Sequence, residues 1–116
     1  MKILVVDSLR GHLSMAKKIL GFEGFEVITT QRGEEALMLL TQNPEIKLAI
    51  VDLDLEGQMQ GPDLVKKIRE LVPSVVWLMT GSSYHKIIPD LKKFLVKPFS
   101  SQDLIKAVKQ TLEAQK

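Results

Sequence analysis

The sequence predicts an α/β domain in which a parallel β-sheet is covered by helices on both faces. Short apolar runs alternate with amphipathic stretches along the 116-residue chain. The runs are almost continuously apolar, which is typical of strands buried on both faces. Because crossovers between parallel strands are right-handed, this alternation produces a doubly wound sandwich.

Five apolar runs are expected to form the strands. Each is short, rich in β-branched or aromatic residues, and followed by polar or turn-forming residues. The expected strands are Ile3–Val6, Glu26–Thr30, Leu48–Val51, Val75–Met79 and Phe94–Val96.

Four amphipathic stretches are expected to form helices. Ser8 is the expected N-cap of the first, and Gly33 precedes the second. Pro62 fits the first turn of the third, which Pro73 stops, and Ser100 is the expected cap of the last. The expected inward-facing residues recur at helical spacing: Leu13, Ala16, Ile19 and Leu20; Ala36, Leu37, Leu39 and Leu40; Leu64, Val65, Ile68 and Leu71; Leu104, Ile105, Val108 and Leu112.

Composition indicates one ordinary globular domain over residues 1–116. The chain is 45% apolar and 26% charged, and it has no cysteine, which excludes disulfide scaffolds, Cys-based metal sites and thiol catalysis. A net charge of +2 is too balanced to predict nucleic-acid binding. No apolar run approaches the about 20 residues that span a bilayer. We therefore expect a soluble cytoplasmic protein without a nucleic-acid or membrane partner.

Four polar residues stand where apolar strands end, and these are the candidate site residues. They are Asp7, Asp52, Thr80 and Lys97. In an open α/β sheet, sites form in the crevice beyond the carboxyl ends of the strands. We therefore expect these four side chains to converge despite their separation in sequence.

Such a group of side chains suits phosphoryl transfer. Two carboxylates about 4 Å apart repel by roughly 4 kcal/mol at an effective dielectric near 20, so they favour a divalent cation such as Mg²⁺. A carboxylate beside Mg²⁺ can attack phosphorus and form an aspartyl phosphate. An ammonium and a hydroxyl then bind the phosphoryl oxygens.

Four fragments in this order resemble the response-regulator receiver domain of two-component signalling over the whole chain. They are Lys2-Ile3-Leu4-Val5-Val6-Asp7, Leu48-Ala49-Ile50-Val51-Asp52, Leu78-Met79-Thr80-Gly81 and Phe94-Leu95-Val96-Lys97-Pro98-Phe99. The resemblance implies a flavodoxin-like strand order 2-1-3-4-5 and phosphorylation of Asp52 by a sensor histidine kinase or phosphotransfer protein. It also implies a downstream protein target.

The resemblance assigns further roles to single residues. Asp7 matches an acid that helps to hold Mg²⁺, and Thr80 and Lys97 match the positions that bind the phosphoryl group. Phe94 matches an aromatic that changes rotamer together with Thr80 on activation. The peptide bond between Lys97 and Pro98 is expected to be cis.

The sequence departs from the family pattern at the metal site. Ser8 stands where the family usually has a second acid, so Mg²⁺ binding is expected to be weak, with Asp54 as a candidate substitute ligand. The loop after Asp52 is one residue longer than the family pattern, which places Gly61 one position late. We therefore expect an atypical magnesium site.

The second departure lies before the last strand. Only seventeen positions separate Thr80 from Lys97, too few for a full helix between the fourth and fifth strands, and Pro89 breaks a helix interior. Residues 82–92 are therefore expected to form a short fourth helix or none.

Three functions remain open from the sequence. The first is a stand-alone phosphorylatable receiver, monomeric or weakly dimeric, that catalyses only its own phosphorylation and dephosphorylation. The second is a degenerate receiver that acts as an interaction module without phosphate. The third is a phosphatase resembling the haloacid dehalogenases, suggested by Asp52-Leu53-Asp54. His12 and His85 are expected to be solvated or partly packed, with no metal site of their own.

Overall fold

The computed structural model describes residues 1–82 and 93–114. Within this part, five strands form one parallel sheet in the order β2-β1-β3-β4-β5. The strands are β1 (Lys2–Val6), β2 (Glu26–Thr30), β3 (Ile46–Asp52), β4 (Val76–Gly81) and β5 (Phe94–Val96). The predicted architecture and strand order are confirmed.

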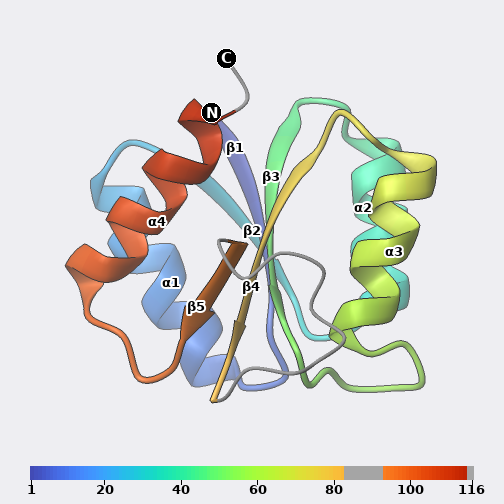
Figure 1. Ribbon diagram of the computed structural model, residues 1–116, viewed down its shortest axis with the longest axis horizontal. Coiled ribbons are helices and arrows are strands. Elements are labelled where there is room, and N and C mark those ends of the chain that lie inside the picture. The colour runs from blue at the N-terminus through green and yellow to red at the C-terminus, as the bar shows by residue number, and fades with distance from the viewer. Residues whose placement is uncertain (83–92, 115–116) are drawn as a thin grey trace.

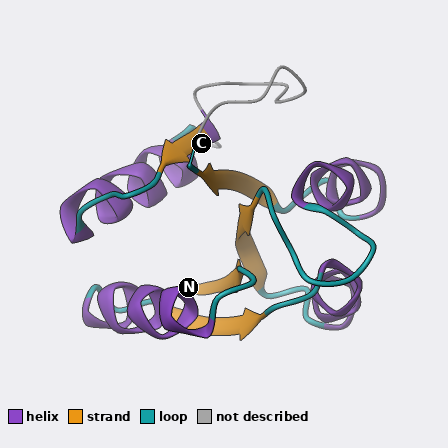
Figure 2. Ribbon diagram, turned by 90° about the horizontal axis from the view of Figure 1, so that it is seen from below, coloured by secondary structure: helices purple, strands orange, loops and turns teal. Residues whose placement is uncertain are grey.

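Helices cover both faces of this sheet, as predicted. On one face lie α1 (Arg10–Phe22) and α4 (Ser101–Glu113), and on the other lie α2 (Gly33–Gln42) and α3 (Gly61–Leu71) (Figure 1). Figure 2 shows the sheet between these two helical layers. The helix expected to be short or missing between β4 and β5 falls on residues 83–92, outside the described residues.

The core is divided by the sheet into two apolar clusters. Successive strand residues point to opposite faces, so Ile3 and Val5 pack toward α1 and α4, whereas Leu4 and Val6 pack toward α2 and α3. The strands are therefore buried on both sides, which explains why their sequences are continuously apolar. This packing fixes the sheet and so fixes the positions of the residues at its carboxyl edge.

The N-termini of α1 and α4 are capped differently. Ser100 caps α4 as predicted, and its hydroxyl accepts from the Asp103 N–H at 3.0 Å. The prediction that Ser8 caps α1 is wrong, because the N-cap position is Leu9 and no side chain caps from there. Instead, Asp7 Oδ1 accepts from the Leu9 N–H at 2.9 Å. The carboxylate that ends β1 thus also orients the start of α1.

One predicted core position is also wrong. Leu71, the last residue of α3, is 57% exposed. The next residue, Val72, packs against the core on this side instead. The apolar stripe of α3 therefore reaches the sheet through Ile68 and Val72 rather than through Leu71.

Candidate functional site

The four predicted site residues meet at the carboxyl edge of the sheet. Asp7 follows β1, Asp52 ends β3, Thr80 lies in β4 and Lys97 follows β5. Asp52 and Thr80 are register partners on neighbouring strands. Because all strands are parallel, their carboxyl ends share one edge, so residues up to 90 positions apart become neighbours.

Lys97 joins the two buried carboxylates. Its Nζ lies 2.8 Å from Asp7 Oδ2 and 3.0 Å from Asp52 Oδ2. Its own N–H donates to the carbonyl of Gly81 at 2.7 Å, and the Lys97–Pro98 peptide bond is cis, as the resemblance implies. The predicted contact of Asp7, Asp52 and Lys97 is therefore present.

Burial sets the electrostatics of this group. Asp7, Asp52 and Thr80 are only 5%, 6% and 3% exposed. Burial, followed by the charge of Asp7, raises the pKa of Asp52, while the hydrogen bond from Lys97 opposes the rise. Burial lowers the pKa of Lys97, but its bonds to the two carboxylates outweigh that effect and leave it raised. Lys97 therefore remains a cation between the two acids.

Asp54 contributes its backbone to this group. Its N–H lies 3.5 Å from Asp52 Oδ1, whereas its side chain is exposed. The Ser8 carbonyl accepts from the Gln31 side chain at 2.8 Å, which ties the β1–α1 connection to the end of β2. The substitution of Asp54 for the acid missing at Ser8 stays a prediction.

The donor set fits a magnesium ion held by few protein ligands. Within residues 1–82 and 93–114, no three His, Cys, Asp or Glu side chains are arranged to hold a metal. Asp7 and Asp52 nevertheless present two buried carboxylates, and Mg²⁺ commonly binds one or two carboxylates, waters and phosphate oxygens. These two residues would hold the ion.

The loop between Asp52 and α3 is fixed by side-chain and backbone contacts. Gln60 accepts from the Leu55 N–H and donates to the Leu55 carbonyl, both at 3.0 Å. The Gly61 N–H donates to the Leu53 carbonyl at 3.0 Å. A Cβ on Gly61 would lie 2.2 Å from the Asp52 carbonyl oxygen, so only glycine fits here. The loop thereby holds the backbone of Asp52 closely.

Comparison with protein-family models matches residues 3–109 to the response regulator receiver domain. The chain belongs to this family. It is 33% identical to a chemotaxis protein CheY homolog of Campylobacter jejuni, over 97% of this chain and 92% of that protein. It is also 32% identical to the transcriptional regulatory protein CpxR of Escherichia coli K12, over 96% of this chain.

Solved structures agree with this assignment. A signal receiver domain of an HD domain-containing protein from Pseudomonas fluorescens has a TM-score of 0.87 at 29% identity, covering 98% of this chain and 95% of that one. A CheY-like receiver domain from Methanospirillum hungatei gives the same TM-score and identity, covering 98% and 94%. The chain spans 49% of CpxR, so it matches about half the length of such relatives. Among the helices of residues 1–82 and 93–114, none is long and apolar enough to cross a membrane.

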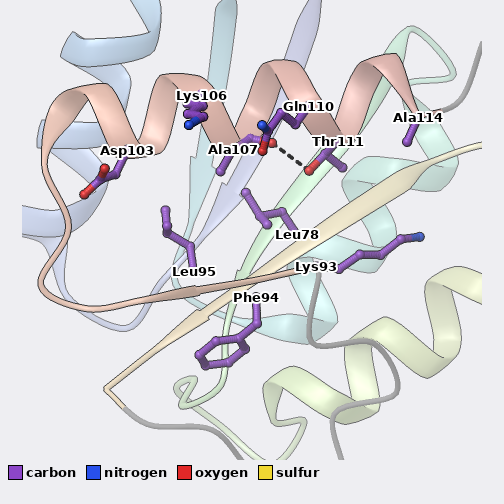
Figure 3. A pocket seen from close by; sticks show the side chains of 10 residues that line it. All are labelled: Leu78, Lys93, Phe94, Leu95, Asp103, Lys106, Ala107, Gln110, Thr111 and Ala114. Carbon is purple, nitrogen blue, oxygen red and sulfur yellow. Dashed lines mark hydrogen bonds between the residues drawn. The ribbon is translucent and has the colours of Figure 1, made fainter.

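Phe94 of this receiver domain packs behind the site. It is 8% exposed and belongs to the apolar cluster under α2 and α3, and its ring lies near Gly81. Figure 3 shows Phe94 and its neighbour Leu95 pointing to opposite sides of β5. The rotamer change of Thr80 and Phe94 stays a prediction.

The receiver domain has a hollow beside the site and another away from it. The first, of about 420 Å³, lies between α1 and the end of β5 and is lined partly by Asp7, His12, Thr80 and Lys97. The second, of about 620 Å³, lies between α4 and strands β4 and β5, with Leu78 among its lining residues (Figure 3). Asp7, Thr80 and Lys97 therefore line the first hollow, whereas Phe94 lines the second.

His12 is a site residue that sequence reasoning missed. Its Nδ1 lies 3.1 Å from Lys97 Nζ and 3.2 Å from Asp7 Oδ2, and its side chain is 46% exposed. The expectation that it is partly packed is confirmed, but its contacts with Asp7 and Lys97 were not predicted. The available signal was its spacing. His12 comes five positions after Asp7, in the first turn of the helix, where side chains tilt back toward the end of the preceding strand. His85 lies outside the described residues.

Proposed function

We propose that this receiver domain accepts a phosphoryl group on Asp52 from the phosphohistidine of a sensor kinase or phosphotransfer protein. The observation that carries the proposal is the ammonium of Lys97 bridging Asp7 and Asp52, with Thr80 on the neighbouring strand. The same edge offers a nucleophile and two groups that can bind the transferred oxygens. The domain then passes the signal on through contact with a downstream protein.

Asp52 Oδ1 is the oxygen available for attack. Lys97 holds Oδ2 at 3.0 Å, whereas the contact from the Asp54 N–H to Oδ1 is longer and weaker, at 3.5 Å. In the transfer, Oδ1 forms a bond to phosphorus, the bond from phosphorus to the donor's histidine nitrogen breaks, and that nitrogen leaves with the electron pair. Lys97 and Thr80 bind the phosphoryl oxygens.

Magnesium, when held by Asp7 and Asp52, would neutralise charge that develops on the transferring group. Ser8 supplies no charge where the family usually has an acid, so binding of the ion is expected to be weak. The chain performs no turnover on other substrates: it catalyses only its own phosphorylation and dephosphorylation.

A second candidate function is a receiver that binds its partner without phosphate. The neutral Ser8 favours it, because it supplies no charge where the family usually has an acid. Such a domain would keep the fold and the Lys97 contacts but would not form an acyl phosphate. A phosphatase of the haloacid dehalogenase type would instead hydrolyse a generic phosphate ester with turnover.

Incubation with acetyl phosphate, with and without Mg²⁺, separates these functions by intact mass. We expect a mass increase of one phosphoryl group that requires Mg²⁺. Asp52→Asn should abolish it, whereas Glu70→Gln, which removes an exposed carboxylate of α3 outside the site, is the control and should keep it. Labelling of Asp52→Asn would reject this acceptor. A wild-type protein that stays unlabelled at high Mg²⁺ would favour the phosphate-independent receiver.

A further inference from the structure

Lys97 uses all three of its N–H bonds on acceptors at the site. Besides Asp7 Oδ2 and Asp52 Oδ2, its Nζ lies 3.1 Å from His12 Nδ1. An ammonium has three donors and no acceptor, so His12 Nδ1 must accept in this contact. The ring proton of a neutral His12 then sits on Nε2.

His12 Nδ1 has a second neighbour, to which it can only donate a hydrogen bond. His12 Nδ1 lies 3.2 Å from Asp7 Oδ2, and a carboxylate oxygen only accepts. Nδ1 can accept from Lys97 or donate to Asp7, but a single nitrogen cannot do both. The arrangement therefore has two states, and the position of Lys97 chooses between them.

We propose that His12 is a positioning residue that replaces Lys97 as the hydrogen-bond donor to Asp7 when Lys97 turns toward a phosphoryl group. This inference rests on the proposed phosphorylation of Asp52. Nδ1 accepts from Lys97 in the first state and donates to Asp7 in the second. Because the His12 side chain is 46% exposed, solvent can exchange the ring proton.

The burial of Asp7 favours such a replacement. Its side chain is 7% exposed, and apart from Lys97 and His12 its hydrogen bond in the structure comes from the Leu9 N–H at 2.9 Å to Oδ1. When Lys97 leaves, Oδ2 loses its bond of 2.8 Å in a buried setting. A buried acceptor without a donor is costly, so a second donor within reach lowers the cost of moving Lys97.

Ring ¹⁵N NMR of histidine-labelled protein at about pH 8, where an ordinary imidazole is neutral, reads the tautomer directly. We expect His12 Nδ1 to be unprotonated in the untreated protein and protonated in Lys97→Met, which removes the competing donor. Signals of His85 are told apart with His12→Asn, whose spectrum lacks His12. An unchanged tautomer in a folded Lys97→Met protein would overturn the proposal, and neither arm requires phosphorylation.

The phosphorylated state gives the second readout. His12→Ala should slow labelling of Asp52 by acetyl phosphate by about fivefold to tenfold, because Asp7 then retains Lys97. His12→Asn should restore the rate to within about twofold, since its amide sits at the Nδ1 position and rotates to accept or donate. Lys18→Ala, on an exposed position of the same helix, is the control and should label normally.

The outcomes separate the two proposals. Equal labelling of wild type, His12→Ala and His12→Asn would overturn the role of His12 while leaving Asp52 as the acceptor. An unlabelled wild-type protein would reject the proposed phosphorylation, and the tautomers in wild type and Lys97→Met would then show whether His12 still exchanges with Lys97 on Asp7.

Discussion

The two aspartates of the site are equally buried but held very differently. Asp7 accepts from the Leu9 N–H, from Lys97 and, in the second tautomer, from His12. Asp52 has one close partner, Lys97, and one long contact at 3.5 Å from the Asp54 N–H. Asp7 is fixed through its side chain, whereas Asp52 is fixed through its backbone, against Gly61.

This difference supports the different roles proposed for the two acids. A carboxylate whose oxygens are both engaged is a poor nucleophile, and it serves better to orient a cation. A carboxylate on a rigid backbone with one loosely held oxygen is placed for attack without being blocked. The difference thus supports Asp52 as the acceptor and Asp7 as the residue that organises Lys97 and α1.

The largest expected effect on stability comes from removing Lys97, because both buried aspartates depend on its charge. Lys97→Met leaves two buried carboxylates without their cation, and we expect the free energy of unfolding to fall by roughly 3–5 kcal/mol at neutral pH. The loss should shrink at low pH, where the Asp52 carboxyl is protonated and no longer needs the cation. Urea denaturation across pH measures it.

Lys109→Met is the matched control for that experiment. Its Nζ lies 3.0 Å from Glu23, the same distance as in the Lys97–Asp52 pair, but the Lys109 side chain is 57% exposed. Exposed pairs contribute little, so a loss below about 1 kcal/mol is expected. Equal losses in the two variants would contradict the importance of burial at the site.

The backbone support of Asp52 predicts the next largest effect. Gly61→Ala places a Cβ 2.2 Å from the Asp52 carbonyl oxygen and 2.8 Å from Leu53 Cα, so we expect a loss of roughly 2–3 kcal/mol in urea denaturation. Gly11→Ala is the control near Asp7, because nothing lies within 4 Å of a Cβ there. In helix α1 it should gain about 0.5–1 kcal/mol. A tolerated Gly61→Ala would show that the Asp52 backbone is not tightly held.

The smallest expected effect comes from removing the charge of Asp52, and it is a gain in stability rather than a loss. Because burial and Asp7 raise the pKa of Asp52, its ionisation destabilises the fold, and stability is lost as pH rises from its ordinary value of 3.8 through the raised one. Asp52→Asn should therefore be more stable than wild type by roughly 1 kcal/mol at neutral pH, as removal of a functional charge often is.

The same substitution should make little difference at low pH. Below about pH 3.8 the wild-type carboxyl is neutral as well, so the two unfolding free energies should approach each other. Thermal unfolding measured at pH 3 and pH 7 tests this. An Asp52→Asn protein less stable than wild type at pH 7 would show that the bond to Lys97 outweighs burial.

Much of the fold was predictable because it depends on local pattern. Continuous apolar runs predicted the five strands, and β2 and β5 have the predicted bounds. Polar residues at the strand ends then predicted the site edge, since parallel strands align their carboxyl ends. The cap of α4 was predictable as well, because the Ser100 bond to Asp103 spans only three residues.

Other features could not be predicted from the sequence because they depend on which elements pack against each other. Serine is common at helix N-caps, which is why Ser8 was predicted there, but the path of the chain after β1 places Leu9 at the N-cap position. Leu71 fits the apolar period of α3, yet it is the last residue of the helix, and Val72 packs inward instead. In both cases one residue of shift at a helix end reversed the assignment.

The sequence by itself determined the doubly wound sheet and the set of acids, hydroxyl and lysine at its carboxyl edge. Both were predictable because a buried strand and the residue that ends it can be recognised from a few consecutive residues. Only the tertiary structure decided that Asp7 and Asp52 share one ammonium, that His12 competes for the same contacts, and that Gly61 lies too close to the Asp52 backbone for any side chain. These are distances of a few ångströms between segments far apart in the chain, and they are set by how the helices pack against the sheet.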